Sequence, residues 1–355
     1  MTPRQSVEAV LAGSRAERTP FTIYENKISF CAAERQLRNR GLCVVRRDIP
    51  VYNTCWPNVT VSSTRYTENG KELTRTEFQT PVGTLDTIAE SAGFTSWTHK
   101  RLFSGPEDYG PLLYFINDMQ FEPNYKAFQQ AQDLDGGDSF FRGNIGSEPM
   151  QQLISGYMGM ETFSMEWFDN RDKILKLVDA LVSKRREVYP LYADSPALAF
   201  NYGGNVTPEI IGLERFEEYY VPHYNEAADV LHQKGKLIGV HFDANCRVIA
   251  KAIADTHLDY IEAFTPAPDT DMTLAEARRA WPEKVLWINF PSSVHLASLE
   301  TIRKTTHNLL AQAGTTENFI MAITEDIPDN LWRANLLEIS KVLSSGVAGD
   351  LKCRV

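Results

Sequence analysis

The second half of the chain alternates short apolar segments with segments of helical periodicity, and this alternation constrains the fold more than any other feature. The apolar segments are rich in branched and aromatic residues, namely "ALAFNYGG", "KLIGVHFD", "LDYIEAFTP", "KVLWINFP" and "NFIMAITED". Their continuous hydrophobicity is typical of parallel strands that are buried on both faces. Five such units, with three more expected in the first half, predict a (β/α)8 TIM barrel, an α/β fold.

A doubly wound parallel sheet is the main alternative fold, and the sequence argues against it. Such sheets usually carry a glycine-rich phosphate turn after the first strand, but the chain contains neither GxGxxG nor GxxxxGK followed by Ser or Thr. The hydrophobic fraction of 43% is sufficient for one large core. We therefore expect residues 1–355 to form a single barrel domain.

The first half of the chain is less regular and predicts additions to the barrel. Residues 58–83 alternate on both sides of Asn69-Gly70, which is the strongest short signal for a β-hairpin. Further helices are expected, including an N-terminal one for which Thr2 suits the N-cap. Residues 133–149 are rich in Gly and Asp and are expected to form a loop that leads into the core.

Charge and cysteine content narrow the class of protein. The net charge of −10 comes without a cluster of Lys and Arg, which argues against nucleic acid and anionic membranes as partners. The five cysteines include no CxxC pair, which favours a reducing compartment, so we expect a cytoplasmic protein. The N-terminal segment lacks the apolar core of a signal peptide, and no apolar run approaches the ~20 residues that a membrane-spanning helix needs.

Polar side chains follow each of the five strands predicted in the second half. They are Asn201, Tyr202 and Asn205, then His241, Asp243 and Asn245, then Glu262, then Asn289, and finally Glu325 and Asp326. Barrel enzymes place their chemistry at the C-terminal rim, where the βα loops converge, so we predict an active site there. The candidate substrate-binding residues are Asn201, Asn205, Asn245, Asn289 and, from the end of the presumed first strand, Glu25.

His241, Asp243 and Asn245 are spaced by two residues, so on an extended strand they point to the same face. Together with Glu325, His241 and Asp243 would offer one imidazole and two carboxylates. This set suits Zn²⁺ and leaves positions open for a substrate. The alternative is that His241 is a hydrogen-bonded rim histidine and that Glu325 caps the helix that follows.

Glu262 and Tyr202 are the candidate catalytic residues. Glu262 lies inside the otherwise apolar "YIEAF", so its carboxylate is either paired with a cation or kept for acid–base chemistry or metal ligation. Tyr202 precedes Gly203-Gly204, which let a backbone approach a ligand closely, although a tight loop alone also explains these glycines.

Four segments carry a resemblance to a known family: "GGNVTPEIIGLERFEEYYVPHYNEAADVLHQKGKLIGVHFDAN", "YIEAFTPAPDTDMTLAEARRAW", "INFPSSVHL" and "ITEDIP". The chain resembles the uroporphyrinogen decarboxylase superfamily over nearly its whole length, and most strongly from Gly203 to Pro328. Within that superfamily it is most similar to the methyltransferase-like branch. The resemblance implies one (β/α)8 barrel with its site in a deep cleft at the C-terminal rim.

The superfamily holds two chemistries. Its decarboxylases work without metal and bind an acidic porphyrinogen through arginines in a segment of the type "MRQAGRY". The corresponding "TIYENKISF" has no arginine and one acid, Glu25, which counts against a carboxy-lyase. Its methyltransferases use zinc to move methyl groups to or from a corrinoid protein, with a His-x-Cys pair and a later cysteine as ligands. At those positions the resemblance places His241, Asp243 and Glu325, so two carboxylates replace two thiolates.

This replacement indicates which substrate atom the metal would contact. Carboxylates leave zinc a harder Lewis acid than thiolates do, and a harder metal better polarises an ether or phenol oxygen. We therefore hypothesise a zinc-dependent demethylase that moves a methyl group from a small O-methyl substrate to a corrinoid protein. Glu262 or Tyr202 would hold or protonate the leaving group. The rival hypotheses are a carboxy-lyase without metal and a non-catalytic barrel that binds a small molecule or a corrinoid protein.

Overall fold

The computed structural model contains two compact units. The residues that it describes are 1–92, 95–314 and 317–345. The first unit consists of residues 1–51, 125–146 and 195–355, and the second of residues 52–124 and 147–194. The expectation of a single domain over residues 1–355 stays a prediction.

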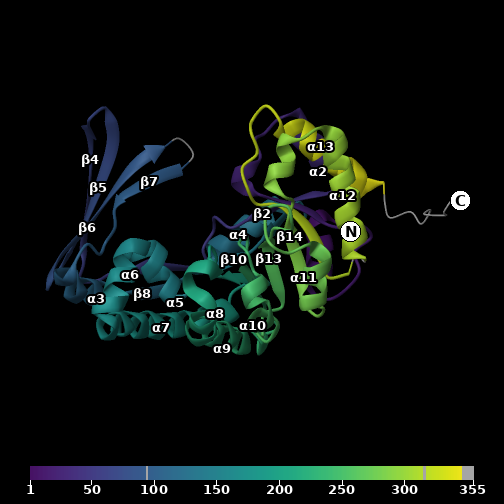
Figure 1. Ribbon diagram of the computed structural model, residues 1–355. Helices are drawn as coiled ribbons and strands as arrows, with labels where there is room; N and C mark the ends of the chain where they lie inside the picture. Colours follow the sequence, from purple (N-terminus) through teal and green to yellow (C-terminus); the bar gives the residue numbers. More distant parts are fainter. Residues whose placement is uncertain (93–94, 315–316, 346–355) are drawn as a thin grey trace, which may run out of the picture. The chain divides into compact units, whose positions relative to one another are not determined.

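The first unit is a parallel β-barrel surrounded by helices, which confirms the predicted TIM-barrel fold (Figure 1). Its nine strands follow the order β10-β11-β12-β13-β14-β15-β1-β2-β9. The strands are β1 (Phe21–Tyr24), β2 (Leu42–Arg46), β9 (Ser139–Phe141), β10 (Gly143–Gly146), β11 (Ala199–Tyr202), β12 (Leu237–His241), β13 (Tyr260–Phe264), β14 (Val285–Asn289) and β15 (Phe319–Ile323). The α-helices are α1 (Pro3–Leu11), α2 (Ala32–Asn39), α4 (Tyr125–Asp135), α8 (Pro208–Tyr219), α9 (Val221–His232), α10 (Ala250–Ala254), α11 (Leu274–Ala280), α12 (Leu299–Ala313) and α13 (Trp332–Ser344). The short helical turns are η1 (Glu25–Lys27), η4 (Arg247–Ile249) and η5 (Ser292–Leu296).

The barrel closes through one interrupted strand. Strand β9 pairs with β2 and strand β10 pairs with β11, and Arg142 alone separates β9 from β10. Counted as one position, β9 and β10 reduce the nine strands to the eight positions of a TIM barrel. The expectation of a loop over residues 133–149 is therefore wrong. Aspartates before the buried pair Phe140 and Phe141, and glycines on both sides of it, concealed a short strand.

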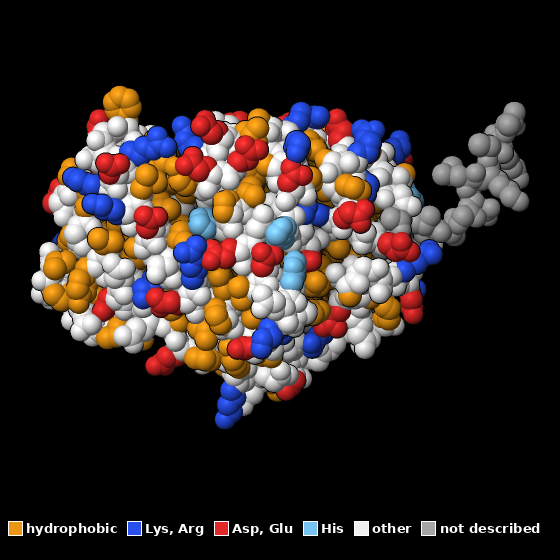
Figure 2. Space-filling model, turned by 90° about the horizontal axis from the view of Figure 1, so that it is seen from below, with side chains coloured by type: hydrophobic (Ala, Val, Ile, Leu, Met, Phe, Trp, Pro, Cys, Tyr) orange, Lys and Arg blue, Asp and Glu red, His pale blue; other side chains and the backbone are white. Residues whose placement is uncertain are grey.

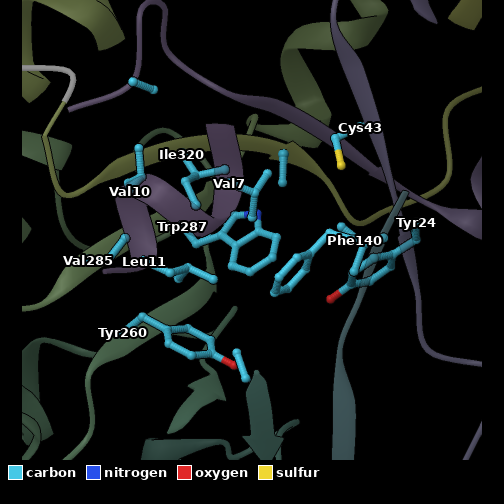
Figure 3. Close-up of a cluster of buried hydrophobic side chains, with 14 residues drawn as sticks. Val7, Val10, Leu11, Tyr24, Cys43, Phe140, Tyr260, Val285, Trp287 and Ile320 are labelled. Carbon is cyan, nitrogen blue, oxygen red and sulfur yellow. The ribbon is translucent and has the colours of Figure 1, made fainter. Parts of the chain in front are cut away.

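Aromatic side chains fill the barrel interior, with Trp287 of β14 among them (Figure 3). The centroid of its ring lies 5.8 Å from that of Phe140 on β9 and 5.9 Å from that of Tyr260 on β13. Its Nε1 donates a hydrogen bond to Oγ1 of Thr22 on β1 at 2.9 Å. Trp287 therefore contacts side chains of β1, β9 and β13 in the barrel interior.

Helix α1 covers the N-terminal end of the barrel. Thr2 caps the helix as predicted, because Thr2 and Gln5 form a reciprocal capping box. One face of the helix adds three residues to the cluster around Trp287, namely Val7, Val10 and Leu11 (Figure 3). The same cluster contains Ala199 and Val285, the first residues of β11 and β14. The opposite, C-terminal end of the barrel carries the loops that follow the strands.

The second unit contains a four-stranded antiparallel sheet, a smaller two-stranded sheet and several helices (Figure 1). Its strands are β3 (Tyr52–Cys55), β4 (Thr60–Glu68), β5 (Lys71–Thr80), β6 (Gly83–Ala92), β7 (Thr95–Lys100) and β8 (Gln120–Pro123). Its helices are η2 (Pro106–Asp108), α3 (Tyr109–Asn117), α5 (Pro149–Gln151), η3 (Gln152–Met158), α6 (Met160–Asp169) and α7 (Arg171–Ala193). The predicted hairpin is confirmed as β4 and β5, joined by Asn69 and Gly70 with φ of 51° and 76°, as a type I′ turn requires.

The surface carries charges of both signs. On the face shown in Figure 2, Lys and Arg side chains are interspersed with Asp and Glu side chains rather than gathered in one area. Among the helices that the structure describes, none combines the length and the apolar character needed to cross a bilayer.

Candidate metal centre

The three predicted metal ligands meet at the C-terminal end of the barrel. His241 is the last residue of β12, Asp243 lies in the loop that follows it, and Glu325 lies just after β15. One ligand atom from each side chain can be chosen so that all three lie within 4.8 Å of one another. All three side chains are partly exposed, so a small molecule can reach them. The rim position predicted from the ends of the strands is therefore where these side chains lie.

The spacing of His241 and Asp243 is compatible with two ligands of one zinc ion. Bonds of about 2.0–2.1 Å in a tetrahedral arrangement bring ligand atoms to about 3.3 Å from one another. Nε2 of His241 lies 3.4 Å from Oδ2 of Asp243. One nitrogen and two carboxylate oxygens also leave a position for a substrate, as catalytic zinc sites do. Within residues 1–92, 95–314 and 317–345, this is the one group of His, Cys, Asp and Glu side chains that converges in this way.

The second ring nitrogen of His241 contacts a carboxylate. Nδ1 lies 2.8 Å from Oε2 of Glu262 and 3.3 Å from the hydroxyl oxygen of Tyr24. Metal-binding histidines usually donate their other ring N–H to a carboxylate, which fixes the orientation of the ring. Gly204 supports the ring from another side, because a Cβ at that position would lie 3.0 Å from Cβ of His241. The ring is thereby placed with Nε2 toward Asp243.

Glu262, on β13, is fully buried and lies in a network of polar side chains. Its Oε1 forms an ion pair with Nη1 of Arg142 at 3.0 Å, although the N–H is not aligned as a hydrogen bond. The same oxygen accepts a hydrogen bond from the hydroxyl of Tyr24. Its Oε2 also accepts a hydrogen bond from Nδ2 of Asn201 at 2.9 Å. Burial alone would raise the pKa of Glu262, but the charges of Arg142 and His241 lower that pKa far below its usual range. Glu262 is therefore a buried anion with its oxygens already engaged.

The backbone next to Glu262 departs from a regular strand. Ala263 has φ of 58°, a region that alanine rarely adopts. The pairing of β13 with β14 shifts register between Glu262 and Phe264, so Ala263 forms a β-bulge. Bulges often re-aim a side chain beside an active site, and here the bulge adjoins the residue that contacts His241.

The charges around His241 favour a cation at this position. Burial lowers the pKa of His241, but the charge of Glu262 and the contact with Asp243 raise that pKa to about 10. Metal ligation requires a neutral imidazole, so a metal ion has to displace a proton from Nε2. The carboxylates that favour the proton also attract a divalent ion.

Asn245 does not join this cluster, although its spacing predicted the same face as His241 and Asp243. Strand β12 ends at His241, so the alternation of side chains does not continue to Asn245. Nδ2 of Asn245 donates to Oε1 of Glu209 at 2.6 Å, and its Oδ1 accepts the backbone N–H of Asp271 at 3.0 Å. The structure thus places Asn245 where it links the first turn of α8 to the loop that follows β13.

Asn201 and Asn289 are both buried at strand ends, but only Asn201 contacts the network around Glu262. Oδ1 of Asn289 accepts the backbone N–H of Thr324 at 3.0 Å, and its Nδ2 donates to Oγ1 of Thr265 at 3.3 Å. Asn289 therefore joins the ends of β13, β14 and β15 to one another.

The remaining predicted residues lie in different surroundings. Tyr202 is buried, and its ring packs edge-on against Tyr224 of α9 with centroids 5.7 Å apart, on the opposite side of β11 from Asn201. Asn205 is exposed and adopts a left-handed backbone conformation with φ of 55°. Asp326, next to Glu325, forms an ion pair with Lys27 at 2.8 Å.

Three residues of this end of the barrel were not found from the sequence. Tyr24 and Arg142 contact Glu262, and the guanidinium carbon of Arg47 lies 3.4 Å from the centroid of the Tyr24 ring. Arg47 also forms an ion pair at 3.2 Å with Glu25, which was predicted to bind the substrate. Tyr24, Arg47 and Arg142 all lie at or just beyond the ends of short barrel strands, and this position is the signal that could have revealed them.

Comparison with known proteins gives a matching family model and a solved structure of similar fold. The family described as "Uroporphyrinogen decarboxylase (URO-D)" matches residues 150–339. The structure of a methyltransferase from Methanosarcina mazei has a TM-score of 0.57 at 10% sequence identity, and the match covers 97% of this chain and 99% of that chain. At this identity the likeness concerns the fold alone.

A second solved structure is much more distant. The spore cortex-lytic enzyme SleL of Bacillus megaterium has a TM-score of 0.31 at 11% identity, covering 64% of this chain and 64% of that chain, and supports no argument here. No curated protein sequence matches the chain. Because the family match spans more than half of its residues, the chain belongs to the uroporphyrinogen decarboxylase family.

Proposed function

We propose that this protein is a cytoplasmic, zinc-dependent methyltransferase that moves a methyl group from a small O-methyl substrate to a corrinoid protein. The observation that carries the proposal is the convergence of His241, Asp243 and Glu325 at the C-terminal end of the barrel. Family membership supports an enzyme with its site at this end, and the likeness in fold to a methyltransferase is compatible with it.

The residues of the cluster define the chemistry that the site would perform. Zinc bound there would supply Lewis acidity to an oxygen of the substrate. Asp243 and Glu325 would hold the ion through oxygen ligands, and His241 through Nε2. Their two negative charges equal the charge of the divalent ion, so the centre is neutral overall and suits an uncharged ether. The bond between oxygen and methyl carbon would break with the electron pair left on the oxygen, and the reduced corrinoid of the partner would supply the acceptor for the methyl group.

A carboxy-lyase without metal is the second candidate, because the matching family is named for a decarboxylase. An acidic porphyrinogen would need cations that are free to bind its carboxylates. Arg47 and Arg142, the arginines described above at this end of the barrel, are paired with Glu25 and Glu262. This pairing favours the methyltransferase over the lyase.

The metal content of the protein tests the proposal first. After mild purification we expect about one zinc ion per chain and its loss in His241→Ala. The matched control is His257→Ala, which removes an exposed histidine paired with Asp229 and should retain the metal. A metal-free wild-type protein, or a His241→Ala variant that keeps its zinc, contradicts the proposal.

Assays of substrate turnover distinguish the methyltransferase from the carboxy-lyase and from a non-catalytic barrel. With a methoxyaromatic substrate and chemically reduced cobalamin, the wild-type protein should produce the absorbance of an alkylated corrinoid, and His241→Ala should not. Release of CO₂ from an acidic porphyrinogen by metal-free protein would instead support the carboxy-lyase. Ligand binding that is unchanged in Asp243→Asn, without turnover of either substrate, would support a non-catalytic barrel.

A further inference from the structure

We propose that Glu262 and Arg142 form a buried charged pair whose function is to position His241 for metal binding. The inference rests on the proposed metal site and adds to it. It assigns Glu262 as a positioning residue rather than a proton donor, and it gives a role to Arg142. Neither side chain would touch the substrate, because Glu262 and Arg142 are 0% and 5% exposed.

Four side chains, three from barrel strands and one from the break between β9 and β10, hold the carboxylate of Glu262 in place. Tyr24 comes from β1, Arg142 from the break between β9 and β10, Asn201 from β11 and His241 from β12. Each carboxylate oxygen contacts two of them: Oε1 contacts Tyr24 and Arg142, and Oε2 contacts Asn201 and His241. A carboxylate restrained from four directions cannot rotate away from Nδ1 of His241, so the imidazole ring keeps one orientation.

The burial of this pair indicates a purpose other than stability. A buried ion pair loses the hydration of both charges, and replacing such a pair with apolar residues often leaves stability unchanged or improves it. The contact of Glu262 with Nδ1 of His241 indicates that the function of the pair is to act on this histidine. A carboxylate at the second nitrogen makes an imidazole a better metal ligand and fixes the nitrogen that faces the metal.

The backbone is irregular at both members of the pair. Arg142 is the residue that interrupts the strand formed by β9 and β10, and Ala263, beside Glu262, has φ of 58° within a bulge. Regular strands would alternate their side chains without interruption. Two separate departures from that pattern at the two partners of one ion pair indicate that the fold is shaped to bring these partners together.

Titration of the metal-stripped, full-length protein with Co²⁺ tests the inference, with the visible absorbance of the bound ion as the readout. We expect Glu262→Gln to bind Co²⁺ about 10- to 100-fold more weakly than the wild-type protein, and with a changed spectrum. Arg142→Met should also weaken binding, and Arg142→Lys, which keeps the charge, should restore most of the affinity.

Two further variants separate positioning from folding. The double variant Glu262→Gln with Arg142→Met leaves no unpaired buried charge, so it should remain folded by circular dichroism and still bind Co²⁺ weakly. Lys284→Met is the matched control. It removes a buried cation that bonds the carbonyls of Thr256 and Leu258 and lies just before β14. It should lower stability without changing Co²⁺ affinity.

The outcomes distinguish this inference from the function on which it rests. If the wild-type protein binds Co²⁺ through His241 but Glu262→Gln and the folded double variant bind it within about threefold of the wild type, the positioning role is wrong and the metal site stands. If the wild-type protein binds no Co²⁺, the metal site is wrong and the positioning role fails with it.

Discussion

Nδ1 of His241 lies 2.8 Å from Oε2 of Glu262, and this contact joins the rim of the barrel to its interior. The side chain of His241 is 17% exposed and that of Glu262 is fully buried. A substitution in the core should therefore alter the proposed metal site without touching a proposed ligand or a substrate.

The carboxylate ligands should matter for stability only when zinc is bound. At a zinc concentration about 100 times its Kd, the free energy of unfolding of the wild-type protein should rise by about 2.7 kcal/mol. Glu325→Gln should lose most of this gain. Its metal-free form should be no less stable than the wild type, because the substitution removes a negative charge that lies close to Asp243. Chemical denaturation with and without zinc measures both effects.

Asp326→Asn is the control for that experiment. It removes the ion pair with Lys27 beside the site, and the stabilisation by zinc should persist. Equal stabilisation of Glu325→Gln and the wild-type protein by zinc would show that Glu325 is not a ligand.

Gly204→Ala should damage the metal site through sterics. The added Cβ would lie 3.0 Å from Cβ of His241, and the position has φ of +145°, so strain of about 1–3 kcal/mol is expected. Zinc affinity should fall because the imidazole ring has to move. Gly235→Ala is the comparison, since Gly235 has φ of +65° but a Cβ added there would meet no atom of a more distant residue within 4 Å. Gly235→Ala should lower stability and leave zinc affinity unchanged, and an equal loss of affinity in both variants would argue against steric contact with His241.

Ala263 should tolerate glycine and reject valine. Ala263 is buried and has φ of 58°, which glycine adopts readily and a β-branched residue does not. We expect Ala263→Gly to stay within about 1 kcal/mol of the wild-type free energy of unfolding. Ala263→Val should lose roughly 2 kcal/mol or more through strain and overpacking. Urea denaturation checks both values, and a stable Ala263→Val variant would mean that the bulge is not required.

Tyr202→Phe should leave methyl transfer close to the wild-type rate. The substitution keeps the ring that packs against Tyr224 of α9. Tyr24→Phe, by contrast, removes the hydroxyl that donates to Glu262 and should weaken zinc binding. Steady-state assays and zinc competition on the two variants make the comparison. A loss of turnover in Tyr202→Phe as large as that in His241→Ala would return Tyr202 to the catalytic residues.

The sequence was sufficient to predict the barrel and the three side chains that converge at its rim. Continuous apolar strands alternating with helices leave few other architectures. In such a barrel the residues at the strand ends share one rim, so His241, Asp243 and Glu325 could be associated although β12 and β15 are far apart in the chain. Periodicity alone does not show that these three side chains are close in space, whereas the barrel fold predicts it.

The interior network could not be predicted in the same way. Arg142 was hidden because its strand is short and flanked by glycine and aspartate, so no periodic pattern marked it. The partner of Glu262 was left open between a cation and a catalytic role, and only contacts across the barrel identify Arg142 as that cation. Asn245 shows the opposite error. Strand alternation was extended past His241, where the strand has already ended.

Helix α1 has a consequence for the order in which the chain can fold. Its residue Val7 shares a cluster with Ile320 of β15, so segments from near the two ends of the chain complete one core. Contacts at such separation form late, because the loss of chain entropy precedes any gain from packing. During synthesis the N-terminal end of the barrel must stay incomplete until β15 is available. We therefore expect completion of the fold to follow synthesis of the last strand, with part of the apolar face of α1 exposed until then.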